Sequence, residues 1–102
     1  MIVKQEGHIY ELKNFETDGS QTITFVKKGP ASEGSTEMIT EIPGTTNEEV
    51  LKALINRMQY LNTKFYSREN SIVITRLEEA LMWLGKRTAD RIERGVEGKH
   101  IA

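Results

Sequence analysis

The segment ENSIVITRLEEALMWLGKRTADRIERGVEG, residues 69–98, is the longest run of the chain with one continuous helical period. Apolar residues recur every three or four positions in its first half, which places them on one stripe of a helix. These residues are Val73, Leu77, Ala80, Leu81 and Leu84. Ser67 is positioned to cap the first turn, and Gly95 can adopt the left-handed conformation that closes a helix. The sequence therefore predicts a helix over residues 68–94 whose apolar stripe another element must cover.

Three arginines occupy the last turns of this predicted helix: Arg87, Arg91 and Arg94. Their spacing of four and three places the guanidinium groups on one side, one turn after Trp83. Like charges at this spacing repel by about 0.2–0.5 kcal/mol per pair, and a bound phosphate or carboxylate would offset that cost. The alternative is that the arginines are solvated and pair with Asp90 and Glu93, because charged runs usually form solvated faces.

The length and composition indicate one small intracellular domain. A chain of 102 residues buries about two thirds of its unfolded surface, so association with further copies is expected. The net charge of −1 argues against binding of a nucleic acid polymer through bulk electrostatics. There is no cysteine, no apolar run of the ~18 residues that a membrane span requires, and no signal-peptide core at the N-terminus. We therefore expect a soluble protein without a membrane partner.

The first 42 residues follow the two-residue period of β-strands. Residues 7–15 and 22–28 are predicted strands, and the Asp-Gly turn in residues 17–20 predicts an antiparallel hairpin between them. A third strand is predicted over residues 36–42, after a polar loop, and residues 1–4 form a further short strand. Pro43 and Gly44 end this region.

A second helix is predicted over residues 47–62, directly after the β region. Thr46 with Glu49 forms a capping box, and Thr45 with Glu48 offers the alternative register. An apolar stripe follows on this helix: Val50, Leu51, Leu54, Ile55, Met58 and Leu61. The short connection over residues 62–67 predicts that the two helices fold back on each other.

These elements predict a single α+β domain over residues 1–102. A small N-terminal antiparallel β-sheet of three to four strands, residues 1–43, precedes a C-terminal antiparallel two-helix hairpin with a long second helix, residues 44–98. Residues 99–102 form a tail. The long helix exceeds its partner by about two turns, so the arginines lie where one protomer cannot cover them.

The residues that catalysis would need are not arranged for it. His8 lies in a predicted strand and His100 in the tail, and neither has a nucleophile close in sequence. No metal motif and no dinucleotide-binding glycine pattern occurs, so we expect no enzyme, no metal site and no cofactor.

A binding site is the remaining possibility. Tyr60 and Trp83 offer aromatic surfaces on which a base could stack, at about 1–3 kcal/mol each. The alternative, which we favour for Trp83, is that Trp83 lies in the core and Tyr60 at an interface. Asn70 has paired donor and acceptor atoms that suit a base edge or a ribose hydroxyl, and it could equally help to cap the second helix.

The two helices also resemble a known family. The segments GTTNEEVLKALINRMQYLN and RENSIVITRLEEALMWLGKRTADRIERGVEGKH are similar to the helical-hairpin domain shared by phage Thoeris anti-defence sponges and phage anti-CBASS sponges. The resemblance rests on E-N at the start of the second helix, L-E-E-A-L-M-W-L in its middle, and K-R-T-A-D-R with G-V-E-G at its end. The preceding β region resembles the Thoeris branch.

This resemblance implies a non-enzymatic protein in the host cytoplasm that sequesters a cyclic nucleotide immune signal. In the Thoeris branch the signal is an isomer of cyclic ADP-ribose, and some members also bind cyclic trinucleotides at a second site. Family members associate as dimers, often as trimers of dimers. The residues that match the family's ligand-binding positions are Tyr60, Asn70, Arg87 and Arg91, with Asp90 as the acidic residue from a neighbouring protomer.

Two other functions are compatible with the residues alone. A small phage regulator could use the arginines to contact DNA phosphates, and its binding would then depend steeply on salt. A structural oligomer of a phage particle could satisfy them with carboxylates of the next subunit, and it would bind no small anion.

Overall fold

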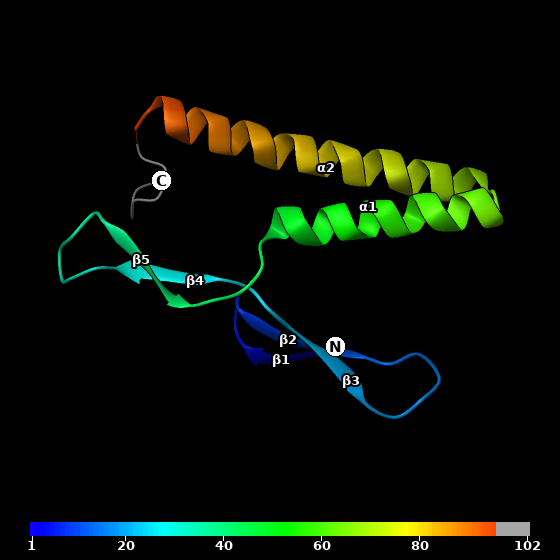
Figure 1. The fold of residues 1–102 in the computed structure, drawn as a ribbon, viewed down its shortest axis with the longest axis horizontal. Helices are drawn as coiled ribbons and strands as arrows, with labels where there is room; N and C mark the ends of the chain where they lie inside the picture. Colours follow the sequence, from blue (N-terminus) through cyan, green and yellow to red (C-terminus); the bar gives the residue numbers. More distant parts are fainter. Residues whose placement is uncertain (96–102) are drawn as a thin grey trace. The chain divides into compact units, whose positions relative to one another are not determined.

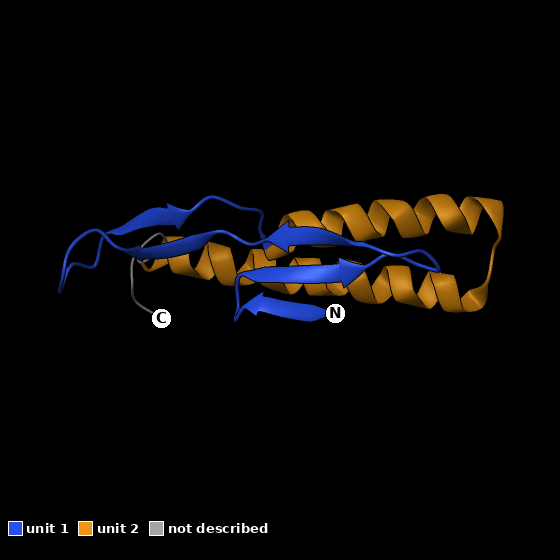
Figure 2. Cartoon of the chain, turned by 90° about the horizontal axis from the view of Figure 1, so that it is seen from below, with its two compact units in different colours: residues 1–46, 98–102 blue, residues 47–97 orange. Residues whose placement is uncertain are grey.

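The computed structural model describes residues 1–95, which divide into two compact units, residues 1–46 and residues 47–95 (Figure 2). The predicted tail with His100, and the last residues of the predicted hairpin, lie outside the described residues. Within residues 1–95, no helix is long and apolar enough to cross a bilayer.

The first unit consists of five short strands in two antiparallel sheets (Figure 1). The strands are β1 (Ile2–Gln5), β2 (Ile9–Lys13), β3 (Ser20–Thr24), β4 (Lys27–Pro30) and β5 (Met38–Ile42). β1, β2 and β3 form one sheet in that order, and β4 pairs with β5. The predicted hairpin is confirmed: Tyr10 lies opposite Ile23, and Gly19 turns the chain with a φ of 100°.

The predicted strand over residues 22–28 is divided between the two sheets, because the segment after β5 returns to its middle. The backbone N–H of Thr45 donates to the carbonyl of Thr24 at 2.9 Å, and the N–H of Val26 donates to the carbonyl of Thr45 at 2.9 Å. A Cβ at Gly44 would lie 2.6 Å from the Thr24 carbonyl oxygen, so the approach requires glycine. The α+β class and element order are confirmed, and the strands form two sheets.

The second unit is the predicted antiparallel helical hairpin, of α1 (Asn47–Lys64) and α2 (Arg68–Glu93) (Figure 1). α2 has 26 residues and α1 has 18, so about two turns of α2 extend beyond the start of α1. The predicted caps of α2 are confirmed. The hydroxyl of Ser67 accepts a hydrogen bond from the backbone N–H of Asn70 at 3.0 Å, and Gly95 has a φ of 72°.

The two helices meet along a narrow line of half-buried side chains, which we call the seam. On α2 its residues alternate in steps of three and four, as in a coiled coil, and on α1 they do the same. The seam of α2 contains Ile74, Leu77, Leu81, Leu84 and Thr88, and that of α1 contains Leu51, Ile55, Met58 and Asn62.

Three residues predicted for the apolar stripes are exposed and lie outside the seam. Val73 and Leu54 are each 42% exposed, and Ala80 is also exposed. They lie outside it because a straight pair of helices buries only the positions that face the partner helix, and Ile74 occupies that position instead of Val73. Among residues 1–95 no apolar side chain is fully buried. The described part of one chain therefore has no closed hydrophobic core.

Candidate ligand-binding site

The arginine end of α2 carries three of the predicted site residues, Arg87, Asp90 and Arg91. With 3.6 residues per turn, Arg87, Arg91 and Arg94 fall within an arc of about 60° on the helix surface. Arg91 lies at the inner edge of this arc, in line with Leu84 and Thr88. It is only 8% exposed, whereas Arg87 is exposed.

The burial of Arg91 has a consequence for its possible role. A buried guanidinium must be paired, because a charge without a partner in a low-dielectric environment is costly. Arg91 does have an interaction within this chain. Arg91 is therefore buried and has a partner within the chain, while Arg87 is exposed to solvent.

Asp90 lies beside the arginines on the exposed surface of α2. Its carboxylate accepts a hydrogen bond from Lys86 Nζ at 3.1 Å, one turn earlier. Its backbone carbonyl accepts the N–H of Arg94 at 3.1 Å and so takes part in closing the helix. Asp90 thus has a lysine partner already, although both side chains are more than half exposed.

The turn end of the hairpin carries the other two predicted site residues, Tyr60 and Asn70. Tyr60 is 59% exposed, and the ammonium of Lys64 lies 5.6 Å from the centre of its ring. This is a cation–π contact on one face of the ring. A base that stacks on Tyr60 must use the other face or displace Lys64.

Asn70 already contributes to the structure of the turn. Its backbone N–H donates to Ser67, and its side-chain amide donates to the carbonyl of Phe65 at 3.3 Å. The side-chain oxygen of Asn70 therefore remains as the group that could accept a hydrogen bond from a ribose hydroxyl or a base.

Asn62 is a residue that the sequence reasoning did not single out. Its side-chain oxygen accepts the N–H of Ser67 at 3.1 Å, and its amide donates to the hydroxyl of Ser71 at 3.2 Å. It joins the last turn of α1 to the first turn of α2. The polar run in residues 62–67 could have suggested a hydrogen-bonded turn, but not which side chain would span it.

The two ends do not come together within one chain. Asn70 and Arg87 both lie on α2, and seventeen residues of helix separate them by about 25 Å. The structure therefore brings Arg87, Asp90 and Arg91 together at one end and Tyr60 and Asn70 at the other.

Trp83 is not a core residue in the described chain, contrary to our expectation. It is 57% exposed and lies on the side of α2 that faces away from the seam. The expectation was wrong because the apolar residues flanking Trp83, Leu81 and Leu84, occupy the seam in its place.

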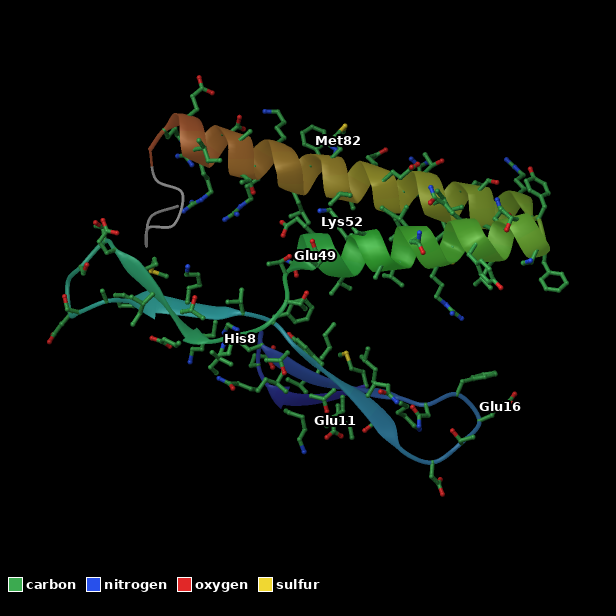
Figure 3. All side chains as sticks on the ribbon, in the orientation of Figure 1. His8, Glu11, Glu16, Glu49, Lys52 and Met82 are labelled. Carbon is green, nitrogen blue, oxygen red and sulfur yellow. The ribbon has the colours of Figure 1, made fainter. Side chains whose placement is uncertain are left out.

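An open groove of about 510 Å³ follows one side of the helix pair. Its lining combines the polar side chains of Lys52, Asn56, Gln59 and Glu78 with the apolar side chains of Ile55, Leu81 and Met82. Lys52 also pairs with Glu49 at 3.5 Å (Figure 3). The sequence did not single out the polar residues of α1 in this groove, because exposed polar positions on a helix look alike in sequence.

The described residues contain no group of three or more histidine, cysteine or acidic side chains that could hold a metal ion.

His8 precedes β2 (Figure 3), and its backbone carbonyl accepts the N–H of Phe25. Its Nδ1 is buried and has no hydrogen-bond partner among the described residues.

Comparison with known proteins assigns the family. The sequence model of the Acb2/Tad1 hairpin domain family matches residues 19–89, more than half of the chain. The chain belongs to this family. The match to the Acb2/Tad1 family includes Tyr60, Asn70 and Arg87, and it ends just before Asp90 and Arg91. It also begins within the β region, earlier than the resemblance of the helices alone indicated.

One similar protein of this family is Thoeris anti-defense 1 of Bacillus phage SBSphiJ7. It is 57% identical to this chain over 58 residues, which are 56% of this chain and 41% of the phage protein. The chain thus aligns with less than half of the length of that relative.

Proposed function

We propose that this chain is a phage anti-defence protein that captures a cyclic nucleotide immune signal without cleaving it. The signal that we favour is an isomer of cyclic ADP-ribose, the messenger of the Thoeris system, with cyclic dinucleotides and trinucleotides as further candidates. The observation that carries the proposal is the 57% identity to a protein named Thoeris anti-defense 1. We place its action in the host cytoplasm, with no membrane and no nucleic acid polymer as partner.

The arginine end would hold the phosphates of this ligand. A guanidinium donates two parallel hydrogen bonds to phosphate oxygens, which makes arginine better suited than lysine for this contact. In our proposal Arg91 is the preset donor, because it is buried and already held. Arg87 then closes on the ligand from the exposed side.

The turn end would hold the base and the ribose. Tyr60 offers a ring that is more than half exposed, and the oxygen of the Asn70 amide can accept a hydrogen bond. Asp90 is proposed as the acidic contact, which requires it to leave Lys86. This change is small because the side chains of Asp90 and Lys86 are exposed.

We propose that two copies of the chain complete one site. The separation of about 25 Å between Asn70 and Arg87 along one helix is too long for a single nucleotide-sized ligand to bridge. The arginines of one protomer must then meet Tyr60 and Asn70 of another. The absence of a buried apolar side chain among residues 1–95 also favours association, since association would bury exposed residues such as Leu54 and Val73. A dimer, or a trimer of dimers, fits this requirement.

Capture without cleavage requires no catalytic group. Sequestration needs tight binding instead. To compete with the effector, the protein should bind its ligand in the nanomolar range or better, about 12 kcal/mol of binding free energy.

Calorimetric titration of the protein with cyclic ADP-ribose isomers, cyclic dinucleotides and cyclic trinucleotides tests this proposal. We expect the wild type to bind one class tightly, Arg87→Ala to weaken that binding, Arg87→Ala/Arg91→Ala to abolish it, and intact ligand to be recovered after the protein is denatured. Arg57→Ala, at an exposed arginine of α1, is the matched control and should bind as the wild type does.

Three results would contradict the proposal. No heat with any ligand would favour the structural oligomer. A ligand recovered in altered form would indicate an enzyme. Binding of DNA with a steep salt dependence, in place of binding to the small ligands, would favour the regulator. Circular dichroism of the double variant separates loss of a contact from loss of the fold.

A further inference from the structure

The side chain of Lys64 covers one face of the Tyr60 ring. Its ammonium lies over the ring, 5.6 Å from the ring centre. The two residues are four apart near the end of α1, so their side chains lie on the same side of the helix. Tyr60 is nevertheless 59% exposed, and among residues 1–95 no other aromatic ring stacks on it. A stacking surface therefore remains on Tyr60 while Lys64 is in place.

The backbone on both sides of this contact is fixed by hydrogen bonds. The hydroxyl of Thr63 donates to the carbonyl of Tyr60 at 2.6 Å, and the side-chain amide of Asn70 donates to the carbonyl of Phe65 at 3.3 Å. Lys64 lies between Thr63 and Phe65. The stems of Tyr60 and Lys64 thus start from an ordered backbone, and the contact between them is formed before a ligand binds.

The position of Lys64 at the end of α1 is not sufficient to explain the contact. A lysine in the last turn interacts favourably with the carbonyl end of the helix dipole. That interaction requires a charge near the last turn, but it does not require the ammonium to lie over a ring. Among residues 1–95 no carboxylate pairs with Lys64. The group that the ammonium contacts is the ring of Tyr60, a candidate ligand-binding residue.

We propose that Lys64 is a positioning residue of the candidate ligand site, which closes one face of Tyr60 so that the base of the ligand stacks on the other face. This inference rests on the proposed function, since it concerns the same base. The preformed contact restricts the rotation of the ring, and a side chain that is already ordered loses less freedom on binding. Lys64 acts through Tyr60 and needs no contact of its own with the ligand.

The charge of Lys64 strengthens the stack in this arrangement. Both faces of an aromatic ring carry negative charge, and a base that approaches face to face brings a similar charge of its own. An ammonium on the far face draws electron density away from the near face, so the repulsion between the two rings decreases. An uncharged side chain of similar length at position 64 would cover the ring without this effect.

The closed face also limits the class of ligand. With Lys64 in place, each Tyr60 ring can stack on one base. A ligand with a single base for each ring, such as an isomer of cyclic ADP-ribose, meets this condition. A ligand that holds the ring between two of its bases does not, because it would have to displace Lys64. Lys64 therefore favours single-base ligands.

Calorimetric titration of Lys64 variants with the cyclic ADP-ribose isomers measures the contribution of the ammonium. Lys64→Met keeps a long side chain without the charge, and it should bind about fivefold more weakly than the wild type. Lys64→Arg should bind at least as tightly as the wild type, because a guanidinium also stacks on an aromatic face. The control is Lys28→Met, at an exposed lysine of β4, which changes the net charge equally and should bind as the wild type does.

Proton NMR locates Lys64 directly, with and without ligand. Protons above an aromatic ring are shielded, so the Hε protons of Lys64 should resonate upfield of those of the other lysines. Tyr60→Leu should remove this shift in the free protein, which assigns the signal. The upfield shift should persist when the ligand binds to the wild type, because the base takes the opposite face of the ring.

The outcomes separate this inference from the proposed function. If the wild type binds no cyclic nucleotide, both are wrong. If the wild type binds but Lys64→Met binds as tightly as Lys28→Met, only the inference is wrong. The same holds if a cyclic dinucleotide or trinucleotide binds in preference to the cyclic ADP-ribose isomers, or if the upfield shift disappears on binding. Circular dichroism of Lys64→Met separates weaker binding from loss of the fold.

Discussion

The two ends of the helical hairpin differ in how their polar and charged side chains are arranged. At the turn end, Asn62, Ser67 and Asn70 use their polar groups on one another and on the backbone. At the arginine end, α2 runs past α1 and carries cationic groups within one arc. Polar groups that are satisfied internally stabilise a fold, and clustered like charges destabilise it unless an anion binds. The hydrogen bonds at the turn end therefore stabilise the hairpin, and we propose that the arginine end binds the phosphates of the ligand.

The largest effect that this comparison predicts is on ligand binding at the arginine end. Arg87→Ala should weaken binding of the cyclic nucleotide by about 100-fold, because it removes a charge-assisted contact that pairs bidentately with phosphate. Arg87→Lys keeps the positive charge but loses the two parallel N–H donors of the guanidinium, so about 10-fold weaker binding is expected. The melting temperature should change little in either variant, since Arg87 is exposed. Titration calorimetry measures the affinity, and thermal melts at matched protein concentration measure the melting temperature. Equal affinities for the wild type, Arg87→Ala and Arg87→Lys would refute the proposal that Arg87 binds the ligand.

A smaller effect, on stability, is predicted at the turn end. Asn62→Ala removes two hydrogen bonds between the helices and leaves the N–H of Ser67 unsatisfied, at a cost of about 2 kcal/mol. Urea denaturation followed by circular dichroism measures this loss. Asn56→Ala, at an exposed position in the middle of α1, is the control and should be near neutral. If both variants lose the same free energy of unfolding, the hydrogen bonds of Asn62 at the turn make no particular contribution to stability.

The smallest effect is predicted for the exposed ion pair at the arginine end. Lys86→Ala breaks the contact with Asp90, and both partners are more than half exposed, so the expected loss is about 0.3 kcal/mol. Denaturation at low and at high salt measures it. A loss above about 1 kcal/mol would show that this end contributes to the stability of the fold after all.

The sequence predicted the helices well because their ends carry local signals. The hydroxyl of Ser67 and the backbone freedom of Gly95 act within one turn, so the bounds of α2 were predicted to within one residue. The division of the β region into two sheets was not predictable in this way. Residues 22–28 read as one strand, and the interruption at Phe25 comes from Thr45, twenty residues later in the chain.

The candidate site was proposed from residue types, and its geometry could not be predicted from the sequence. Helical spacing placed Arg87 and Arg91 on one side of α2, and that relation is local. Whether Tyr60 and Asn70 lie close to these arginines depends on the separation along several helical turns and on contacts between copies. The periodicity of the sequence does not encode either. The exposure of Trp83 was missed for the same reason, because the seam is decided by the partner helix.

The lack of a closed hydrophobic core in the described residues also determines how the protein should respond to temperature. The heat capacity change of unfolding arises mainly from newly exposed apolar surface, and typical domains show about 12–15 cal/mol/K per residue. Since residues 1–95 of one chain bury no apolar side chain fully, a dilute protein should unfold with a smaller value and a broad transition. Scanning calorimetry over a range of concentrations should show the heat capacity change rising toward the ordinary value as copies cover one another.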